Sequence, residues 1–275
     1  MLQNLTTMYK VNIVIPIHNE VLEGDELKSL TQCFSVLKNH TITLACNQRL
    51  NCKAYEQLGE MYGNRPKIER FDDKYFQSAN GYNTLLTEHL FYSRFSEHDY
   101  ILIYQSDCYI FRDDLEEWCS KGFDYIGAPW INTPWLKQTR QELMKQSLQS
   151  KSLLKGFTTK LSWFLKGYYR KDSLNVGNGG VALRKISSCL HISAQTQFVK
   201  SWQGNHEDGF WSIYVPLNFN FKLPDYKEAA AFSFDCDPEV AFEINNRKIP
   251  TACHAWCRKD HPYEGNIAFW QKIIQ

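Results

Sequence analysis

The feature that most constrains the fold is an apolar run, residues 100–104, that ends in Gln105, Ser106 and Asp107. The run lacks the alternation of apolar and polar residues, which predicts a strand buried on both faces in the middle of a sheet. A carboxylate at the end of such a strand has to be paired, bound to a metal ion or held at the open edge of the sheet. Asp107 is therefore expected to face a ligand crevice.

The amino-terminal part predicts a parallel sheet. Residues 11–17 form a β-branched run that leads into the loop sequence His-Asn-Glu, residues 25–37 have apolar residues at helical spacing, and residues 41–46 predict a second strand. This βαβ opening is typical of an α/β fold whose ligands bind at the carboxyl ends of the strands. A helix is predicted over 81–95, and another over 115–121 after the capping residues Asp113 and Asp114.

Residues 136–172 differ from the rest in composition. They are rich in Lys and Gln and predict a basic amphipathic helical insertion. One interpretation is a helix packed on the body with a solvated basic face. The other is a surface, at residues 151–171, that meets anionic lipid or a lipid-linked acceptor. No repeat or linker divides the chain, so residues 1–275 are expected to form a single domain.

Composition excludes some partners. The chain has 31 Lys plus Arg and 30 Asp plus Glu, which gives a net charge of +1. This net charge provides no overall electrostatic attraction to nucleic acid. The start of the chain does not resemble a signal peptide, and no stretch has the roughly 18 uninterrupted apolar residues of a membrane span. Nine scattered cysteines do not suggest a disulfide framework. We expect a cytoplasmic protein, with peripheral contact at the inner face of the membrane as the sharper alternative.

Several motifs carry a resemblance to a known family. IVIPIHNE resembles the first strand of inverting, nucleotide-sugar-dependent glycosyltransferases of the GT-A fold. A set of six further motifs is similar, in the same order, to the DUF5672 family of glycosyltransferase-like proteins: YILIYQSDCYIF, FDYIGAPW, NVGNGGVALRK, NHEDGFWS, FSFDCDPEV and CHAW. The resemblance implies a single GT-A-like α/β domain with a mixed, mostly parallel sheet. It also implies transfer of a sugar from a nucleotide-sugar to a hydroxyl acceptor, a glycan or lipid-linked saccharide.

The same resemblance implies a metal site. Enzymes of the GT-A fold hold Mn²⁺ or Mg²⁺ with an Asp-x-Asp motif, and the cation neutralises the departing diphosphate. Here Asp107 keeps the second position, while Gln105 replaces the first Asp and adds no charge. His254 matches a carboxyl-terminal histidine that binds the same cation, and imidazole suits Mn²⁺. Without the resemblance, a lone histidine in an apolar strand is more often a core residue.

An acidic pair, Glu207 and Asp208, follows the glycine-rich motif as in inverting enzymes of this fold. The resemblance implies that one carboxylate takes the proton from the acceptor hydroxyl. Asp208 is the expected base and Glu207 an anchor for the acceptor hydroxyl, with the reverse assignment left open. The pair could instead cap the helix that contains Trp211.

Further residues are expected around the two substrates. Gly177, Gly179 and Gly180 would let the donor sugar lie against backbone, unless they form a bulge or tight turn. The other donor-binding residues are expected at strand and helix ends: Pro16, His18, Asn19, Asn47, Asn80, Asn83, Gln105, Ser106 and Asp107. The expected acceptor contacts are Trp130, Asn178 and Trp211, and Trp135 is another possible stacking face.

Two rival functions and one rival metal site remain. A binding module would keep the fold without turnover, which the missing first Asp favours. A sugar nucleotidyltransferase would use the same crevice, but no glycine-rich triphosphate loop follows the first strand. Asp235, Asp237 and Glu239 also resemble a metal cluster, yet they lack the spacing of a calcium loop, and we interpret them as a turn before a helix.

Overall fold

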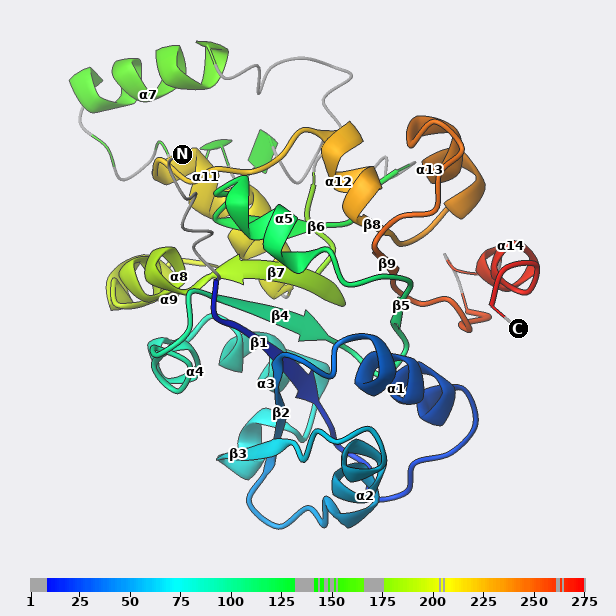
Figure 1. Cartoon of the computed structure of the whole chain (residues 1–275). Coiled ribbons are helices and arrows are strands. Elements are labelled where there is room, and N and C mark those ends of the chain that lie inside the picture. The colour runs from blue at the N-terminus through cyan, green and yellow to red at the C-terminus, as the bar shows by residue number, and fades with distance from the viewer. Residues whose placement is uncertain are drawn as a thin grey trace, which may run out of the picture.

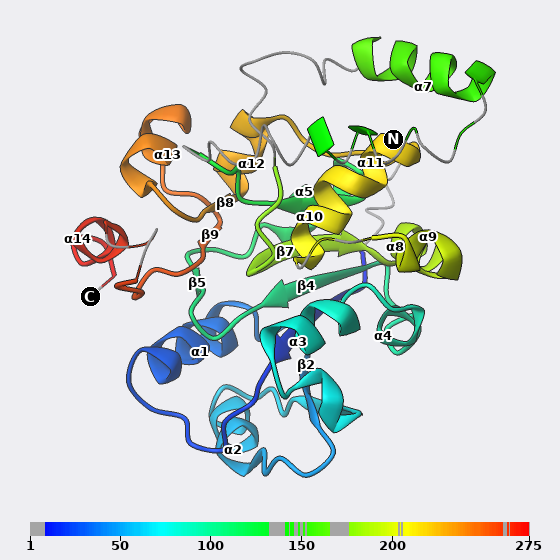
Figure 2. The ribbon, with the colours of Figure 1, turned by 180° about the vertical axis from the view of Figure 1, so that it is seen from behind.

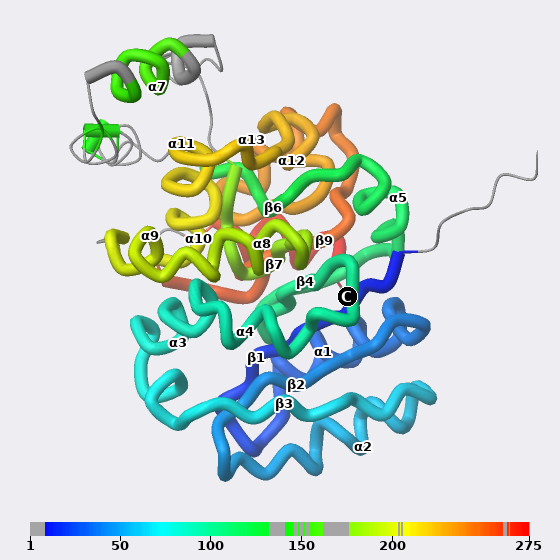
Figure 3. The backbone as a smooth tube through the Cα atoms, turned by 90° about the vertical axis from the view of Figure 1, so that its left-hand side faces the viewer, coloured from blue at the N-terminus to red at the C-terminus, as the bar shows by residue number. Residues whose placement is uncertain are grey.

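The computed structural model describes residues 9–131, 141–142, 144–145, 148, 151, 153–165, 176–202, 204, 206–260, 263 and 265–274. Its main sheet has six strands in the order β3-β2-β1-β4-β7-β6, and Figure 3 shows them stacked in this order. The strands are β1 (Val11–Pro16), β2 (Thr41–Asn47), β3 (Lys67–Phe71), β4 (Tyr100–Tyr104), β6 (Tyr125–Gly127) and β7 (Val181–Lys185).

The directions of these strands decide where the site lies. β1, β2, β3 and β4 are parallel, whereas β7 runs antiparallel to both β4 and β6. Tyr104 at the carboxyl end of β4 pairs with Val181 at the start of β7. The loop that precedes β7 therefore lies beside the residues that follow β4. The predicted α/β class, with a mixed, mostly parallel central sheet flanked by helices, is confirmed.

Helices cover both faces of the main sheet, which explains why β4 has no polar alternation. Leu102 faces the core on the side of α1 (Gly24–Val36), and Ile101 and Ile103 face the core on the side of α3 (Ala79–Leu85). Figure 1 shows α1 on one face, and Figure 2 shows α3 on the other. Burial on both faces is typical of a central strand in an α/β sheet.

A small second sheet brings the carboxyl-terminal part to the same edge. Its strands are β8 (Ser233–Phe234), β9 (Ala252–Cys253) and β5 (Tyr109–Ile110), in the order β5-β9-β8. Because β5 begins two residues after Asp107 and pairs with β9, His254 is carried to the end of β4. This pairing spans more than 140 residues of sequence and makes the site possible.

The remaining helices surround these sheets or, in one case, lie at the periphery of the molecule (Figure 1). They are α2 (Lys53–Met61), α4 (His89–Ser93), α5 (Leu115–Ser120), α7 (Leu153–Leu165), α8 (Ile186–Ser193), α9 (Thr196–Lys200), α10 (Glu207–Gly209), α11 (Val215–Asn218), α12 (Tyr226–Phe232), α13 (Pro238–Ile244) and α14 (Asn266–Trp270). A 3₁₀ turn, η1, spans Asp73–Tyr75, and a π-helical turn, η2, spans Phe210–Tyr214.

The helix predicted over 81–95 is in fact two helices, α3 and α4. The carbonyl of Leu86 accepts hydrogen bonds from the Tyr92 hydroxyl at 2.7 Å and from Trp211 Nε1 at 2.8 Å. Two side chains thus occupy a backbone acceptor that a continuous helix would use. Tertiary packing overrides the helical pattern at this point.

The predicted insertion at 136–172 is described only in part. Residues 153–165 form α7, as its amphipathic pattern predicts, whereas most of residues 132–152 and all of 166–175 lie outside the described residues. Trp135 is among the residues outside the described part. No helix in the described part of the chain combines the length and the apolar character needed to cross a bilayer.

Candidate functional site

The centre of the site is a contact between Asp107 and His254. Asp107 follows the central strand β4, and His254 follows β9. Nε2 of His254 lies 3.2 Å from Oδ1 of Asp107. The side chain of His254 is 6% exposed and that of Asp107 is 24% exposed, so the pair is at the border between core and solvent. The two residues predicted to share a cation therefore lie together.

A second carboxylate lies behind the imidazole. Nδ1 of His254 is 2.8 Å from Oδ1 of the buried Asp235. Burial alone would lower the pKa of His254, but the carboxylates of Asp107 and Asp235 outweigh it and raise the pKa to about 10. The interpretation of 235–239 as a turn before a helix holds for Asp237, after which α13 begins at Pro238. The contact between Asp235 and His254 was not predicted.

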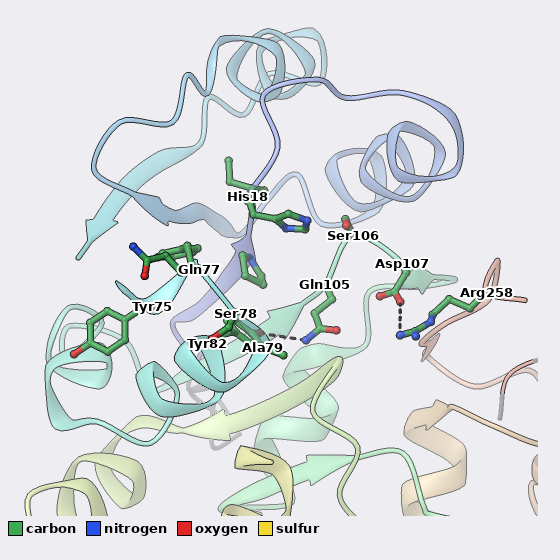
Figure 4. A pocket seen from close by; sticks show the side chains of 13 residues that line it. His18, Tyr75, Gln77, Ser78, Ala79, Tyr82, Gln105, Ser106, Asp107 and Arg258 are labelled. Carbon is green, nitrogen blue, oxygen red and sulfur yellow. Dashed lines mark hydrogen bonds and ion pairs between the residues drawn. The ribbon is translucent and has the colours of Figure 1, made fainter. Parts of the chain in front are cut away.

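Arg258 adds positive charge to the same place. Its Nη1 lies 4.0 Å from Oδ2 of Asp107, and its Nε donates to Oδ1 of Asp260 at 2.9 Å. Burial tends to raise the pKa of Asp107, but His254 and then Arg258 hold the pKa below its ordinary value. Figure 4 shows Arg258 reaching Asp107. Arg258 was not among the residues predicted from the sequence, although it lies two positions after the CHAW motif.

An open pocket of about 540 Å³ begins at Asp107. Five of its lining residues were predicted to bind the donor: Pro16, His18, Gln105, Ser106 and Asp107. Its other lining residues include Tyr75, Gln77, Ser78, Ala79, Tyr82 and Arg258 (Figure 4). Nε2 of Gln105 donates to the hydroxyl of Tyr82 at 3.3 Å, so the residue that replaces the first Asp of the motif is held by a hydrogen bond.

The four asparagines predicted to bind the donor do not line this pocket. Oδ1 of Asn47 accepts from the backbone of Arg49 and Leu50, which makes Asn47 a turn residue. Oδ1 of Asn83 accepts from the backbone of Glu207 at 3.3 Å. Asn19 and Asn80 are exposed beside the pocket-lining segments.

The glycines before β7 make room for side chains of the chain itself. A Cβ on Gly180 would lie 2.1 Å from Cδ2 of His254, and one on Gly179 would lie 2.3 Å from Oε1 of Glu207. Only glycine fits such close approaches. The two positions predicted to face the donor sugar are thus packed against His254 and Glu207. A Cβ on Gly177 would likewise lie 2.2 Å from Oγ of Ser212.

Glu207 is held in a buried ion pair. Its Oε1 lies 2.9 Å from Nη2 of Arg184, and both side chains are nearly inaccessible, at 4% and 0% exposed. Nη1 of Arg184 also donates to the hydroxyl of Tyr92 at 2.9 Å. The ion pair uses one oxygen of the carboxylate that was predicted to anchor the acceptor, whereas the other, Oε2, is buried and meets no hydrogen-bond donor among the described residues.

Asp208 differs from its neighbour. Its side chain is partly exposed to solvent. The loss of hydration around its carboxyl group and then the negative charge of Glu207 raise the pKa of Asp208 to about 7. Its Oδ1 accepts from the backbone of Gly209 at 2.7 Å. Asp208 lies against Gly179 and His254 lies against Gly180, so the expected base and the expected metal ligand border adjacent residues.

The residues predicted to contact the acceptor are largely in the core. Trp211 is fully buried, and its ring contacts Tyr92 and Phe210. It has no face for a sugar, so that prediction is wrong. Trp130 is 6% exposed. Asn178 is also 6% exposed, and its Oδ1 accepts from the backbone of Gly180 at 2.8 Å, so it stabilises the glycine loop.

The family model described as "Protein of unknown function (DUF5672)" matches residues 65–254, more than half of the sequence. The chain belongs to the DUF5672 family. The match contains Asp107, the glycine loop, Glu207, Asp208 and His254. No protein with a curated description has a significant sequence match to this chain.

Solved structures similar to this DUF5672 chain include three glycosyltransferases. Mouse xyloside xylosyltransferase 1 in its apo form is 12% identical, with a TM-score of 0.48 over 90% of this chain and 98% of the other. The galactosyltransferase LgtC with donor and acceptor sugar analogs is 12% identical, with a TM-score of 0.49 over 94% of each chain. Core-mannan synthase A from Aspergillus fumigatus in its Mn/GDP form is 9% identical, with a TM-score of 0.45 over 76% and 71%. Likenesses this distant assign no residue a role.

The Asp107–His254 pair fits a divalent cation. Nε2 of His254 is buried, and no described residue meets it with hydrogen-bond geometry, even though Asp107 is close. Asp235 at Nδ1 orients the imidazole in the way that carboxylates orient metal-binding histidines. The described residues contain no group of three or more His, Cys, Asp or Glu placed to hold a metal. Other ligands would have to come from substrate or water.

Proposed function

We propose that this DUF5672 chain is a glycosyltransferase that moves a sugar from a nucleotide-sugar to a hydroxyl acceptor with inversion. The observation that carries the proposal is the convergence of three groups at one edge of the sheet. These are the Asp107–His254 pair, the guanidinium of Arg258, and the partly exposed carboxylate of Asp208 with its raised pKa. The acceptor class we propose is a saccharide or a lipid-linked saccharide.

The pocket supports a nucleotide-sugar donor. Its volume of about 540 Å³ is in the range of small-ligand sites. Asp107 and Arg258 line it side by side (Figure 4), where they would contact a diphosphate. Tyr75, Gln77, Ser78 and Tyr82 provide aromatic and polar groups for the rest of the donor.

The proposed chemistry is a single displacement. The acceptor oxygen forms a bond to the anomeric carbon, and the bond between that carbon and the diphosphate oxygen breaks. The electron pair leaves with the nucleoside diphosphate, and the hydroxyl proton goes to Asp208. A carboxylate whose pKa is about 7 is suited to accept a proton near neutral pH.

Asp107 and His254 would hold Mn²⁺ or Mg²⁺, which would stabilise the negative charge of the departing diphosphate. Arg258 would add fixed positive charge to the same end of the pocket. Asp235 would orient His254, and Gly180 would let the imidazole approach the end of β4. These roles explain why a buried histidine is flanked by two carboxylates.

The test is incubation of the protein with a panel of nucleotide-sugars, Mn²⁺ and simple saccharide acceptors, with chromatographic analysis of the nucleotide products. The proposal predicts a nucleoside diphosphate from wild type and very little from Asp208→Asn. Release of pyrophosphate from a sugar phosphate and a nucleoside triphosphate would indicate a nucleotidyltransferase instead. Binding of a nucleotide-sugar without its consumption would indicate a binding module.

A further inference from the structure

Helix α7 exposes an apolar face. The side chain of Phe157 is 67% exposed and that of Leu161 is 49% exposed. Because the two residues are four apart in a helix, they lie on the same face, one turn from each other. Phe157 is the only aromatic residue among the highly exposed large apolar residues of the described chain. Because contiguous exposed apolar surface marks interaction sites, this face is a candidate that a second observation has to support.

The same segment is strongly basic. Residues 143–171 contain seven Lys or Arg and no Asp or Glu, in a chain whose overall net charge is only +1. Within α7, Lys155 and Lys160 are exposed. A local concentration of positive charge in a nearly neutral protein attracts an anionic surface. The charge is therefore local to the segment that also exposes Phe157 and Leu161.

The position of α7 leaves this face accessible. Figures 1, 2 and 3 show α7 at the periphery of the molecule, outside the layers that cover the main sheet. Among the described residues, α7 makes no extensive contact with another helix or strand. An amphipathic helix gains most of its stability from burying its apolar face. A partner that covers this face would thus stabilise α7.

We propose that α7 binds the surface of an anionic phospholipid bilayer, lying parallel to it with Phe157 and Leu161 inserted and Lys155 and Lys160 at the headgroups. A bilayer accepts apolar side chains below its headgroups and basic side chains among them, which is the pattern of interfacial helices. Nucleic acid would match the charge but leave the apolar face exposed. This inference is independent of the proposed transferase activity.

The test is co-sedimentation of the full chain with vesicles of phosphatidylcholine alone and of phosphatidylcholine mixed with phosphatidylglycerol. Two double variants are compared with wild type, Phe157→Ser/Leu161→Ser and Lys155→Glu/Lys160→Glu. The matched controls are Met61→Ser/Val240→Ser and Lys38→Glu/Lys53→Glu, which change exposed residues of the same kinds elsewhere. Circular dichroism establishes that every variant is folded.

Wild type is expected to sediment with the anionic vesicles, less so at high salt, and weakly with neutral ones. Each basic residue near an anionic surface contributes about fivefold to binding, so the lysine variant should bind at least about twentyfold more weakly. The apolar variant should lose at least about tenfold, and the controls should bind like wild type. Absence of binding to anionic vesicles, or an equal loss in the controls, would overturn the proposal. A wild-type dimer that Phe157→Ser/Leu161→Ser converts to a monomer, without vesicle binding, would also overturn it.

Discussion

Nε2 of His254 lies 3.2 Å from Oδ1 of Asp107, although the two residues are 147 positions apart in the sequence. The contact depends on the pairing of β5, which begins two residues after Asp107, with β9, which ends immediately before His254. It places an imidazole and a carboxylate at the end of the central strand, beside the pocket that Arg258 also lines. This relationship is the basis of the proposed donor site.

Substitution of Asp208 tests the proposed base. Asp208→Asn removes the proton acceptor but keeps the size of the side chain, so kcat should fall by about 10²- to 10⁴-fold. Affinity for the nucleoside diphosphate should stay within about twofold, because Asp208 does not line the donor pocket. Glu117→Gln, an exposed carboxylate elsewhere, is the control. Near-wild-type kcat in Asp208→Asn would exclude this assignment.

The pH dependence of kcat follows from the pKa of Asp208. Burial and the Glu207 carboxylate raise that pKa to about 7, so the carboxyl is protonated and unable to accept a proton at lower pH. We expect kcat to fall about tenfold per pH unit below this value and to level off above it. The residual activity of Asp208→Asn should lack this dependence. A wild-type profile that is flat from mildly acidic to mildly basic pH would contradict the prediction.

Asp235 is expected to act through His254. Asp235→Asn leaves the shape of the site intact but weakens the orientation and basicity of the imidazole, which should lower Mn²⁺ affinity about 10- to 100-fold. The measurement is calorimetric titration of Mn²⁺ in the presence of the bound nucleoside diphosphate. Asp237→Asn, two residues along the same turn, should bind Mn²⁺ like wild type. Equal affinities in the two variants would remove Asp235 from the site.

Glu207 is expected to matter for stability. Glu207→Gln leaves the buried guanidinium of Arg184 without its charge partner, and breaking such a pair costs about 3–5 kcal/mol in the free energy of unfolding. Urea unfolding measures this cost. The double variant Arg184→Met/Glu207→Leu should recover part of the loss, because no buried charge remains. An unchanged unfolding midpoint for Glu207→Gln would show that the pair is not stabilising the native state.

The sequence predicted the parts of the site that depend on local pattern. The apolar run before Gln105 predicted a central strand, and the run before His18 predicted another strand of the same sheet. Because ligands bind at the carboxyl ends of parallel strands, Asp107 and His18 were expected at the ligand crevice, and both line the pocket. The resemblance to the DUF5672 family added His254, which no local pattern would have selected. The contact between His254 and Asp107 agrees with the prediction that the two residues lie close enough to bind one cation.

The parts that the sequence did not predict depend on side-chain direction and long-range packing. Asp235 was interpreted as a turn residue because nothing nearby indicates that it faces His254 across two short strands. Gly180 was predicted to face the donor sugar, but the absence of a side chain at this position makes room for the imidazole of His254. Trp211 was assigned to the acceptor, although aromatic residues on a helix in so aromatic a chain are more often core. No sequence motif singled out Arg258, so its place beside Asp107 was not predicted.

Asp107 and His254 are proposed to bind a nucleoside diphosphate through a divalent cation. The most direct test is calorimetric titration of UDP, GDP and CDP, with and without Mn²⁺, into wild type, Asp107→Asn and the exposed control Asp113→Asn. We expect Mn²⁺-dependent binding of one nucleotide to wild type and Asp113→Asn, with a loss of at least about tenfold in Asp107→Asn. Binding that is unaffected by Mn²⁺ and by Asp107→Asn, or no binding of any of the three to folded protein, would contradict it.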